Sequence, residues 1–597
     1  MQGPNFALLS PSTDIQVADN ITWIKGNHTM KAGVVVIRDR VDQNGRANYT
    51  GTANFQPAAS TCRTATANTT CYSLADSFLG NFSGYSEASA DPMGHFRFTQ
   101  PEAFAQDSWK VNRKLSLELG LRWQGIFPWY TQGNNISNFD PAVYAASTPV
   151  TILPNGRIDT TKGGNPYAGL VRAGSGVPAD QTIRVPNVNT ALFPLIPAGA
   201  PRGFYNMNGA FGPRVGFAYS LDDKTVIRGG GGLFYYRAQG NLIFSQLNIA
   251  PFLSNTNLDF GNLATLNSVA AAATTQGGIN AIDPNARNPY TYQYSFGVQR
   301  QVTRTVLVEM NYVGNVAHHQ LATPNVNFPG LGVVAANRTA GITNTNYSNP
   351  YKGFTSIGMN RFSSNYNYNS LQVFASKRAG RVTSTIAYTW SKALGDSNGN
   401  NQTLENWSNL SYNYGYLSND RRHAFVATFV IQGPEFKGSN FLVRETAGGW
   451  QLSGVARLQS GAYFNVQAIS ALGVGNVRPD YNGGKIKANN HAGLNGYACG
   501  TAATGCANPF TVPTGANYGN APYGAVQGPG LAQTDVTLSK FFPIGERVRV
   551  KFQADAFNVL NRTNFNGLNL TTTNTNFGTI SSAFPPRQLQ LGLKALF

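Results

Sequence analysis

The last residues of the chain, 587–597, alternate between apolar and polar side chains. The apolar phase holds Leu589, Leu591, Leu593, Ala595 and Phe597, and the polar phase holds Gln588, Gln590, Gly592 and Lys594. Because successive side chains of a β-strand point to opposite faces, this pattern predicts a strand with one apolar and one polar face. A transmembrane β-strand needs about 9–11 residues with this alternation. A half-buried strand of a soluble sandwich shows the same pattern, so its repetition along the chain decides between the two.

The same alternation recurs along the whole chain. Its clearest example covers 115–123, where four leucines and Trp123 share one face, whereas Glu118 and Arg122 share the other. Large apolar residues that end in tryptophan suit lipid with an aromatic side chain at the interface. The predicted strand pairs are 17–25 with 29–38, 104–111 with 115–123, 211–220 with 224–236, 291–301 with 304–313, 368–378 with 382–390, 423–431 with 449–459, and 534–541 with 547–557.

Short and long connections alternate between these strands. Within the pairs the turns are short, as at 26–28 or 379–381, except for a medium connection between 431 and 449. In contrast, 125–210 and 237–290 are long and rich in Pro, Gly and Asn. Repeated long connections of this kind are anomalous in a soluble domain. Outer-membrane barrels have short periplasmic turns and long extracellular loops. The sequence therefore predicts an all-β fold, a large antiparallel transmembrane β-barrel whose short turns are periplasmic and whose long loops are extracellular.

The predicted barrel is expected to be incomplete at its amino end. The pattern gives about fifteen strands, whereas bacterial barrels of this kind usually have an even number, up to about 22 and beyond. Residues 1–10 lack the basic start, the apolar core and the cleavage site of a secretory signal. An export signal and further strands are therefore expected upstream.

Composition supports a strand-and-loop architecture at a membrane. Charged residues make up 12% of the chain, about half the fraction usual for soluble proteins. The net charge is +18, from 45 basic and 27 acidic residues. The basic residues are scattered instead of being clustered on one recognisable module, which disfavours nucleic acid as a partner. Anionic lipid headgroups or an anionic solute are the better match for this charge.

The four cysteines form two close pairs in loop-like stretches. Cys62 with Cys71, and Cys499 with Cys506, are predicted to form short-range disulfides, because an oxidising compartment favours them. A zinc site would need further ligands at suitable spacing, and only His491 lies near a pair. We therefore expect neither a metal nor another cofactor.

Several segments resemble the barrel of TonB-dependent receptors, in particular the Oar-like group. The segments that carry this resemblance are residues 18–26, 104–110, 211–219, 388–393, 419–423, 449–454, 556–561 and 585–591. They include Ala-Asp-Asn-Ile-Thr-Trp, Phe-Gly-Pro-Arg-Val-Gly-Phe and Ala-Phe-Asn-Val-Leu-Asn, and they run in order over nearly the whole chain. The carboxypeptidase-regulatory-like sandwich and the plug of that family have no counterpart here, so residues 1–597 match a partial, barrel-only domain.

The resemblance implies a location, partners and an activity. It implies a barrel in the cell outer membrane, in contact with outer-membrane lipids and lipopolysaccharide, which takes up or exports a bulky ligand. A TonB-type energy-coupling protein would be a partner only if a plug exists upstream. Leu589, Leu591, Leu593 and Phe597 resemble the terminal signal through which the barrel assembly machinery recognises such proteins.

Charged residues on the polar phase are the candidate functional residues. They are predicted to face the lumen, where they contact a plug domain, a solute path or each other, and they are Glu118, Arg122, Glu309, Arg457, Arg549, Lys551 and Asp555. No catalytic constellation accompanies them, so the chain is not expected to be an enzyme. Residues 229–232 lack the Lys-Ser/Thr of a phosphate loop, and His318-His319 is interpreted as a solvated loop pair.

Two other functions stay open at this stage. One is a complete, plugless pore or surface adhesin of the outer membrane. The other is a secreted, soluble β-rich protein that binds carbohydrate, although the alternating connections argue against it. The absence of clustered carboxylates of the glycosidase type argues against an enzyme of that class.

Overall fold

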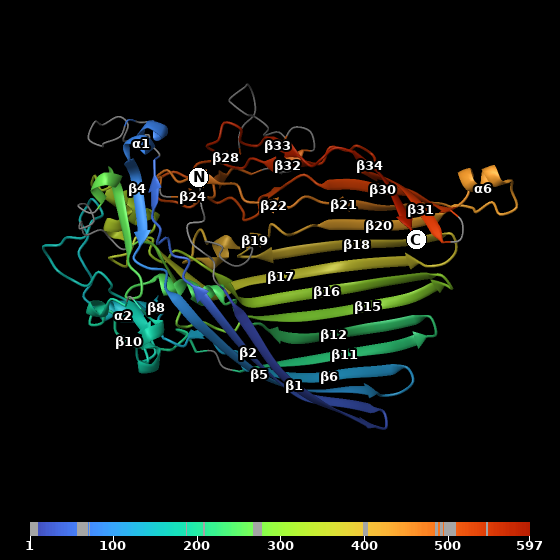
Figure 1. Cartoon of the computed structure of the whole chain (residues 1–597), viewed down its shortest axis with the longest axis horizontal. Coiled ribbons are helices and arrows are strands. Elements are labelled where there is room, and N and C mark those ends of the chain that lie inside the picture. Colours follow the sequence, from blue (N-terminus) through green and yellow to red (C-terminus); the bar gives the residue numbers. More distant parts are fainter. Residues whose placement is uncertain are drawn as a thin grey trace.

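A computed structural model gives the fold of the chain (Figure 1). It describes residues 10–55, 70, 72–186, 188–206, 209–266, 277–397, 404–473, 475–483, 488–489, 493–494, 509–544 and 547–597.

The main element is one large sheet whose long strands are antiparallel. Within the described residues this sheet has 18 strands, of which β7 (Tyr130–Thr131), β14 (Ile279–Ile282) and β19 (Gly415–Tyr416) are short. The other fifteen form what we call the wall. In order of pairing they are β1 (Ser12–Lys25), β2 (His28–Asn44), β5 (Met93–Lys110), β6 (Leu115–Gln124), β11 (Ala210–Asp222), β12 (Thr225–Tyr235), β15 (Tyr290–Thr303), β16 (Val306–Ala322), β17 (Ile357–Lys377), β18 (Val382–Gly395), β20 (His423–Gln432), β21 (Trp450–Gln459), β30 (Leu531–Ile544), β31 (Val548–Phe557) and β34 (Gln588–Leu596).

Each predicted strand pair is present in the wall. The turn between β1 and β2 has Lys25 paired with His28, and Gly26 takes a positive φ of 58°, which glycine adopts without steric cost. Several strands are longer than the sequence predicts. β2 continues to Asn44 instead of ending at 38, and β17 begins at Ile357 instead of 368.

The wall has two chemically different faces. The strand register connects Leu119 of β6 with Val215, Gly231 and Tyr294, and from strand to strand on to Leu591 of β34. We call the side of Leu119 and Leu591 the leucine face and the opposite side, which carries Glu118, the polar face. The strand register therefore puts the apolar residues of 115–123 and of 587–597 on the same face of the wall.

Glycines on the leucine face let aromatic rings lie close to the backbone. A Cβ at Gly229 would lie 2.5 Å from the ring of Phe217 and 3.4 Å from that of Phe296. Phe217 and Phe296 belong to β11 and β15, the two strands that pair with β12. Residues 229–232 thus lie inside β12 and serve packing, as expected for glycines in a strand.

The position of the histidine pair corrects one prediction. His318 and His319 lie inside β16 and not in a loop. The register against β17 shifts between Ala317 and Gln320, and His319 takes a positive φ of 55°. Such an irregularity is a β-bulge, which re-aims side chains near the end of a strand.

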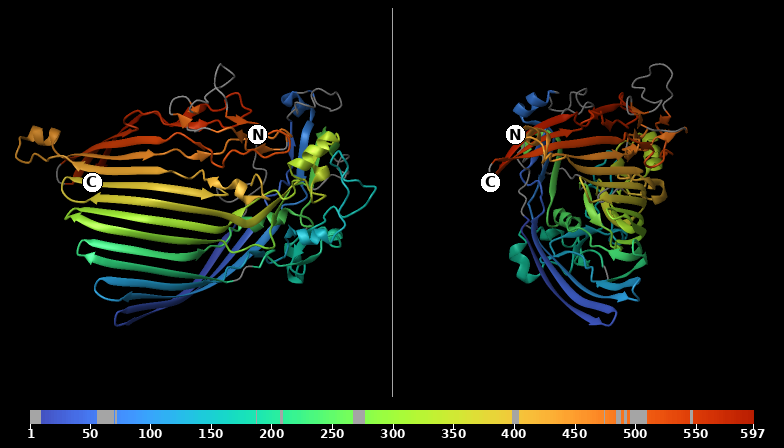
Figure 2. Two further views of the ribbon diagram at one scale, coloured as in Figure 1. Left: turned by 180° about the vertical axis from the view of Figure 1, so that it is seen from behind. Right: turned by 90° about the vertical axis from the view of Figure 1, so that its right-hand side faces the viewer.

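The wall curves around a hollow and has two edges. Figure 2 shows the curvature of the sheet from the blue strands to the red ones. Among the described residues, β1 pairs with β2 alone and β34 with β31 alone. The last residue of β34 that pairs, Leu596, lies opposite Arg549 near the start of β31, so the chain ends on the side of the short turns.

The long connections gather at the other end of the wall, where they form what we call the cap (Figure 1). The cap comprises the described residues between consecutive wall strands at that end, together with the strand ends that continue into them. Its strands are β3 (Thr52–Asn54), β4 (Asn81–Ala88), β8 (Ser137–Phe139), β9 (Leu170–Ala173), β10 (Ala198–Ala200), β13 (Asn255–Asn262), β22 (Tyr463–Phe464), β23 (Ala468–Ile469), β24 (Asn476–Val477), β25 (Asp480–Tyr481), β26 (Ala488–Asn489), β27 (Gly493–Leu494), β28 (Phe510–Thr511), β29 (Val526–Gln527), β32 (Phe565–Leu568) and β33 (Ile580–Ala583).

Short helices complete the described structure. Those of the cap are α1 (Ser73–Leu79), α2 (Pro141–Ala145), α3 (Asn241–Phe244), α5 (Leu331–Thr339), η1 (Ala179–Arg184), η2 (Thr190–Leu192), η3 (Ser245–Asn248), η4 (Leu263–Thr265), η5 (Thr345–Ser348) and η6 (Leu410–Asn413). The helix α6 (Phe441–Ala447) instead lies at the end with the short turns. No described helix is both long and apolar enough to cross a membrane.

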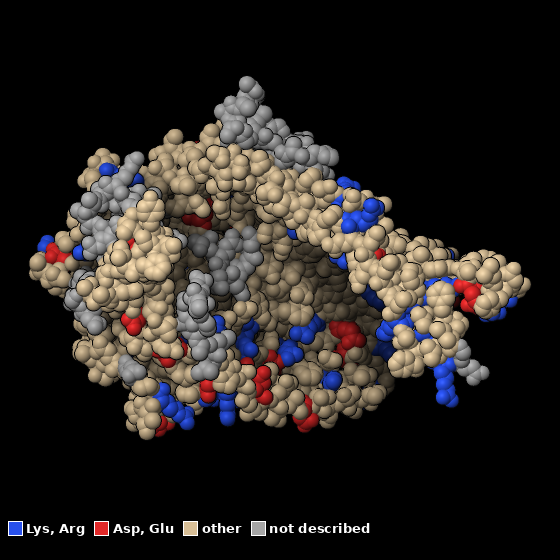
Figure 3. Space-filling view, turned by 45° about the horizontal axis from the view of Figure 1, so that its top comes forward, with Lys and Arg blue, Asp and Glu red and all other residues tan. Residues whose placement is uncertain are grey.

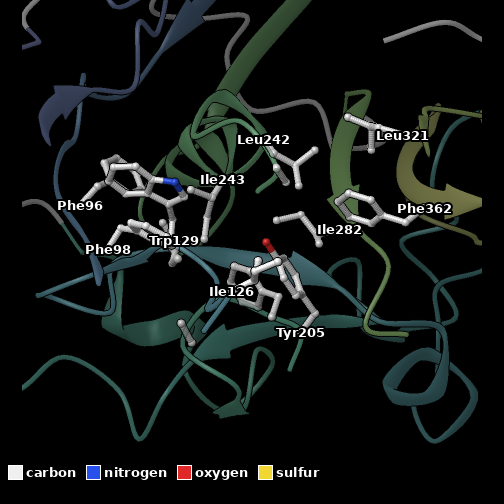
Figure 4. Close-up of a cluster of buried hydrophobic side chains, with 14 of the residues drawn as sticks. Phe96, Phe98, Ile126, Trp129, Tyr205, Leu242, Ile243, Ile282, Leu321 and Phe362 are labelled. Atoms are coloured by element: carbon white, nitrogen blue, oxygen red, sulfur yellow. The ribbon is translucent and has the colours of Figure 1, made fainter. Parts of the chain in front are cut away.

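The buried hydrophobic core lies in the cap. One cluster packs Phe96, Phe98 and Trp129 against Phe244 and the neighbouring aliphatic side chains of α3 (Figure 4). A second surrounds Phe139 and Phe354. The sequence predicts these stretches as long loops, but the structure gives them sheets and a core of their own.

Candidate functional site

The seven charged residues predicted from the sequence share the polar face. The register places Glu118 and Arg122 in β6, Glu309 in β16, Arg457 in β21, and Arg549, Lys551 and Asp555 in β31, all opposite the leucine face. Lys, Arg, Asp and Glu side chains gather inside the hollow of the molecule (Figure 3). That the polar face lines a water-filled lumen stays a prediction.

Near the cap, the polar face carries a buried carboxylate that the sequence analysis missed. Glu102 of β5 is 5% exposed and forms an ion pair with Arg122. Gln100 also donates to Glu102, and the Nε2 of Gln124 donates to its Oε1 at 2.9 Å. The predicted strand begins at residue 104, whereas β5 begins at Met93, so Glu102 lay outside the predicted polar phase. Charge-assisted contacts of this kind fix the orientation of both side chains.

On β30 and β31, near the opposite edge of the wall, the polar face carries a chain of hydrogen bonds. The Nζ of Lys551 donates to Gln553 Oε1 at 2.8 Å, and the Nε2 of Gln553 donates to Asp555 Oδ1 at 2.9 Å. Thr537 Oγ1 of β30 donates to the same Asp555 oxygen at 2.6 Å. Two predicted charges are therefore linked through an amide instead of contacting each other directly.

The terminal apolar residues lie on the leucine face. Leu589, Leu591 and Leu593 belong to β34, and Phe597 follows its last residue. Leu591 is 74% exposed, so this face of the edge strand has no protein neighbour that covers it among the described residues. Their role as an assembly signal stays a prediction.

An arginine of the cap lies between the wall and the first hydrophobic cluster. Arg237 Nη1 contacts Asp39 Oδ2 at 2.8 Å, and its guanidinium lies 4.1 Å from the ring centre of Phe98. Tyr205, in the same cluster, has a raised pKa because burial disfavours the phenolate. These contacts join the extended end of β2 to the cap.

A second arginine joins three segments of the cap. Arg478 is buried, its Nε contacts Glu405 Oε2 at 3.0 Å, and its guanidinium stacks 3.7 Å from the ring centre of Tyr412. Its Nη1 donates to the carbonyl oxygen of Ala521 at 2.9 Å. Burial, and then the Glu405 charge, raise the pKa of Tyr412. A buried pair that is satisfied in this way fixes one arrangement of the chain.

Other predicted site residues do not form a site within the described part of the chain. No group of three or more His, Cys, Asp or Glu side chains among the described residues could hold a metal ion. His318 Nδ1 contacts Asn365 Oδ1 at 2.8 Å. Cys62, Cys71, Cys499 and Cys506 lie outside the described residues, so their pairing stays a prediction.

A curved antiparallel sheet with one apolar face, one charged face, short turns at one end and large loops at the other is the architecture of a transmembrane β-barrel. The model of the family described as "Outer membrane beta barrel domain" matches residues 2–590. The chain belongs to this family, and its location is the outer membrane.

Solved structures of outer-membrane transporters and receptors match the chain. The outer membrane transporter YddB from Escherichia coli is 11% identical, with a TM-score of 0.51, over 98% of this chain and 54% of that chain. The FrpB iron transporter from Neisseria meningitidis is 10% identical, with a TM-score of 0.43, over 98% and 55%. A variant of the ferric enterobactin receptor PfeA from Pseudomonas aeruginosa is 9% identical, with a TM-score of 0.45, over 98% and 54%.

The chain spans about half the length of the solved structures that it matches. Curated proteins give no match to this sequence.

Proposed function

We propose that the chain is the barrel part of an outer-membrane transporter that moves a bulky solute, and that it is related to the Oar-like TonB-dependent receptors. The observation that carries this proposal is the polar face, on which charged residues from β6 to β31 share one side of the sheet. Such a face lines the lumen in barrels of this type. The hollow seen in Figure 3 supports this placement.

The orientation in the membrane follows from the connections. Long loops of outer-membrane barrels are extracellular and short turns are periplasmic, so the cap is assigned to the extracellular side. Outer-membrane lipids, lipopolysaccharide and the barrel assembly machinery are the proposed partners. A TonB-type protein joins them only where a plug domain accompanies the barrel. A plugless pore or adhesin of the outer membrane is the second candidate.

Ion selectivity in a planar bilayer tests the proposed path. The exposed arginines Arg457 and Arg549 lie on the polar face. Replacing both with glutamate is expected to shift the reversal potential in a salt gradient toward cation selectivity, because the changes reverse charge along the path. The matched control is Arg300→Glu with Lys377→Glu, which changes the same charge on the leucine face.

The control variant is expected to keep the selectivity of the unmodified chain. If both double variants shift the reversal potential equally, the polar face does not line the path. The planar bilayer contains no coupling protein, so this assay does not distinguish TonB-dependent transport from passive diffusion. Uptake by cells in which the coupling protein is deleted makes that distinction.

A further inference from the structure

A cavity of about 620 Å³ lies in the cap, where four segments of the chain meet. Its lining comes from the start of β17, the end of β16, β14, and the segment 239–245 that contains α3. It adjoins both hydrophobic clusters, because Leu242 and Leu321 belong to the first and Ile279 packs against the second. Ligand cavities of proteins commonly measure about 300–1,000 Å³.

Strand geometry places polar side chains on one side of this cavity. Ser356 precedes β17, and Gly358 and Asn360 alternate along it with the buried Ile357 and Met359 of the second cluster. β14 pairs with β17 in parallel, with Asn280 opposite Gly358. On the other side, Asn325 forms a bridge with Gly358. The strands β14 and β17 and the bridged residue Asn325 therefore place polar groups side by side.

The lining is polar but uncharged. Among the described residues that line the cavity there is no Lys, Arg, Asp or Glu, although the chain carries 72 such residues (45 basic and 27 acidic). Its polar side chains are amides and hydroxyls, namely Gln239, Asn241, Ser245, Asn280, Thr323, Asn325, Ser356 and Asn360. A strongly charged solute finds no counter-charge on this surface.

Much of the hydrogen-bonding capacity of these side chains is unused. Asn360 Oδ1 accepts from Thr323 Oγ1 at 2.9 Å, which leaves its two amide N–H donors. In the described part of the chain, no hydrogen bond is made by the side chains of Gln239, Asn241 or Asn280. Each of these amides has two donors and one acceptor oxygen.

Two glycines keep the cavity open. A Cβ at Gly358 would lie 2.9 Å from Asn280 Oδ1, and a Cβ at Gly278 would lie 2.4 Å from Ser356 Oγ. Side chains at these positions would push the polar groups out of place. Their absence lets the amide of Asn280 and the hydroxyl of Ser356 face the same space.

We propose that this cavity binds a neutral, polyhydroxylated solute, namely a carbohydrate segment of about two or three sugar units. Sugar hydroxyls both donate and accept, as the amides of the cavity do. Leu242, Leu321 and Ile279 offer apolar surface to the C–H groups of a sugar ring. The inference rests on the proposed function for the direction of arrival, since the cap is the side from which an external solute enters.

Binding of neutral trisaccharides to the full chain in detergent micelles tests the inference. The probes are maltotriose, cellotriose and xylotriose, measured by saturation-transfer NMR and calorimetry, with ferric citrate as a charged competitor. At least one trisaccharide is expected to bind, and ferric citrate is expected not to displace it, because the lining has no cation to hold it.

Two variants and one matched control locate the site. Asn280→Leu is expected to weaken binding about tenfold, the effect of losing one or two hydrogen bonds. Asn241→Trp fills the cavity from an exposed position of α3 and is expected to abolish binding. Asn285→Leu changes an exposed asparagine outside the lining and is expected to leave binding unchanged.

Three results would overturn the inference. They are no binding of any of the three trisaccharides, unchanged binding by both cavity variants, and displacement by an equal concentration of ferric citrate. The selectivity assay of the polar face is independent of the cavity, so it succeeds or fails on its own.

Discussion

Large apolar side chains are exposed in the wall, whereas the core of the cap buries them. In the wall, Leu591 and Leu593 are 74% and 77% exposed, and Leu119 of a strand paired on both sides is still 45% exposed. In the cap, Phe96 and Phe139 are fully buried. A large exposed apolar surface is unstable in water. The difference shows that the wall needs lipid around it, whereas the cap has a buried core of its own.

Polar groups follow the same division. The cap buries Asn138, whose Oδ1 accepts from the amide of Ile282 and whose Nδ2 donates to the carbonyl oxygen of Ile282, both at 2.8 Å. The side chain thus replaces a strand partner for that backbone. On the polar face of the wall, exposed Arg457 and Arg549 remain open to solvent. Asn138 thus serves the internal structure of the cap, whereas Arg457 and Arg549 stay at the surface of the wall.

The largest expected effect comes from the core of the cap. Phe139→Ala removes a ring whose centre lies 4.8 Å from that of Tyr351 and 5.7 Å from that of Phe354. The local free energy of unfolding is expected to fall by about 3–5 kcal/mol, because the change leaves a cavity. Hydrogen exchange of the β8 and β9 amides measures it. Phe436→Ala, at an exposed position, is the control.

The wall is expected to keep its heat-modifiable gel mobility in the Phe139→Ala variant, since the cap core is separate from the leucine face. Joint unfolding of wall and cap would contradict the division into two regions.

A smaller effect is expected from charge on the leucine face. Leu119→Arg and Leu591→Arg place a cation in hydrocarbon, which costs about 2–4 kcal/mol at the bilayer centre. Their refolding yield into lipid vesicles is expected to fall far below that of the polar-face controls Gly120→Ser and Gln590→Arg. Heat-modifiable mobility on gels compares the four variants. Equal yields would show that the two faces have been assigned to the wrong environments.

The predicted disulfides affect only the long connections. If Cys62 pairs with Cys71 and Cys499 with Cys506, each bond closes a small ring. Each bond then stabilises the folded form of its loop by about 2–3 kcal/mol. Peptide mapping under non-reducing conditions is expected to find these two pairs. Reduction is expected to leave the insertion of the wall unchanged. Four free thiols, or a bond between the two loops, would exclude the pairing.

The wall could be predicted from the sequence because alternation at period two is a local signal. At 115–123 every second residue is leucine or tryptophan, and the strand β6 covers Leu115–Gln124. A short turn then fixes each partner. The seven charged residues shared a face for the same reason, since one register carries the phase from strand to strand.

The cap could not be predicted in this way. β14 has four residues and pairs in parallel with the start of β17, which is distant in the sequence. No local sequence pattern predicts such a contact. Glu102 and Asn360 are polar residues that tertiary contacts bury, so their sequence surroundings resemble those of loops. The amide-lined cavity depends on four segments between residues 239 and 360, which only the fold brings together.

The smallest expected effect is a pH dependence where the wall meets the cap. Asp396 directly follows β18, is 3% exposed, and its Oδ1 accepts from the backbone N–H of Asn365 at 2.9 Å. Burial raises the pKa of Asp396 above its ordinary value. Because the folded state then holds the proton more tightly than the unfolded state, the stabilisation is present at low pH and is lost as the pH rises through the folded pKa. Asp420 has a pKa raised by burial as well, so it acts in the same direction.

Protection of the amide of Asn365, and of the Ala393 amide that donates to Asp420 Oδ1, corrected for intrinsic exchange rates, is therefore expected to decrease as the pH rises through the folded pKa of the two carboxyls. Asp396→Asn retains an acceptor oxygen for Asn365 but carries no titrating proton, so it is expected to reduce this decrease, and adding Asp420→Asn is expected to remove it. Amides at the short-turn end, such as those of β34, serve as the internal control because neither carboxyl lies near them. A decrease that persists in the double variant would assign the pH dependence to other groups and would contradict the raised pKa values of Asp396 and Asp420.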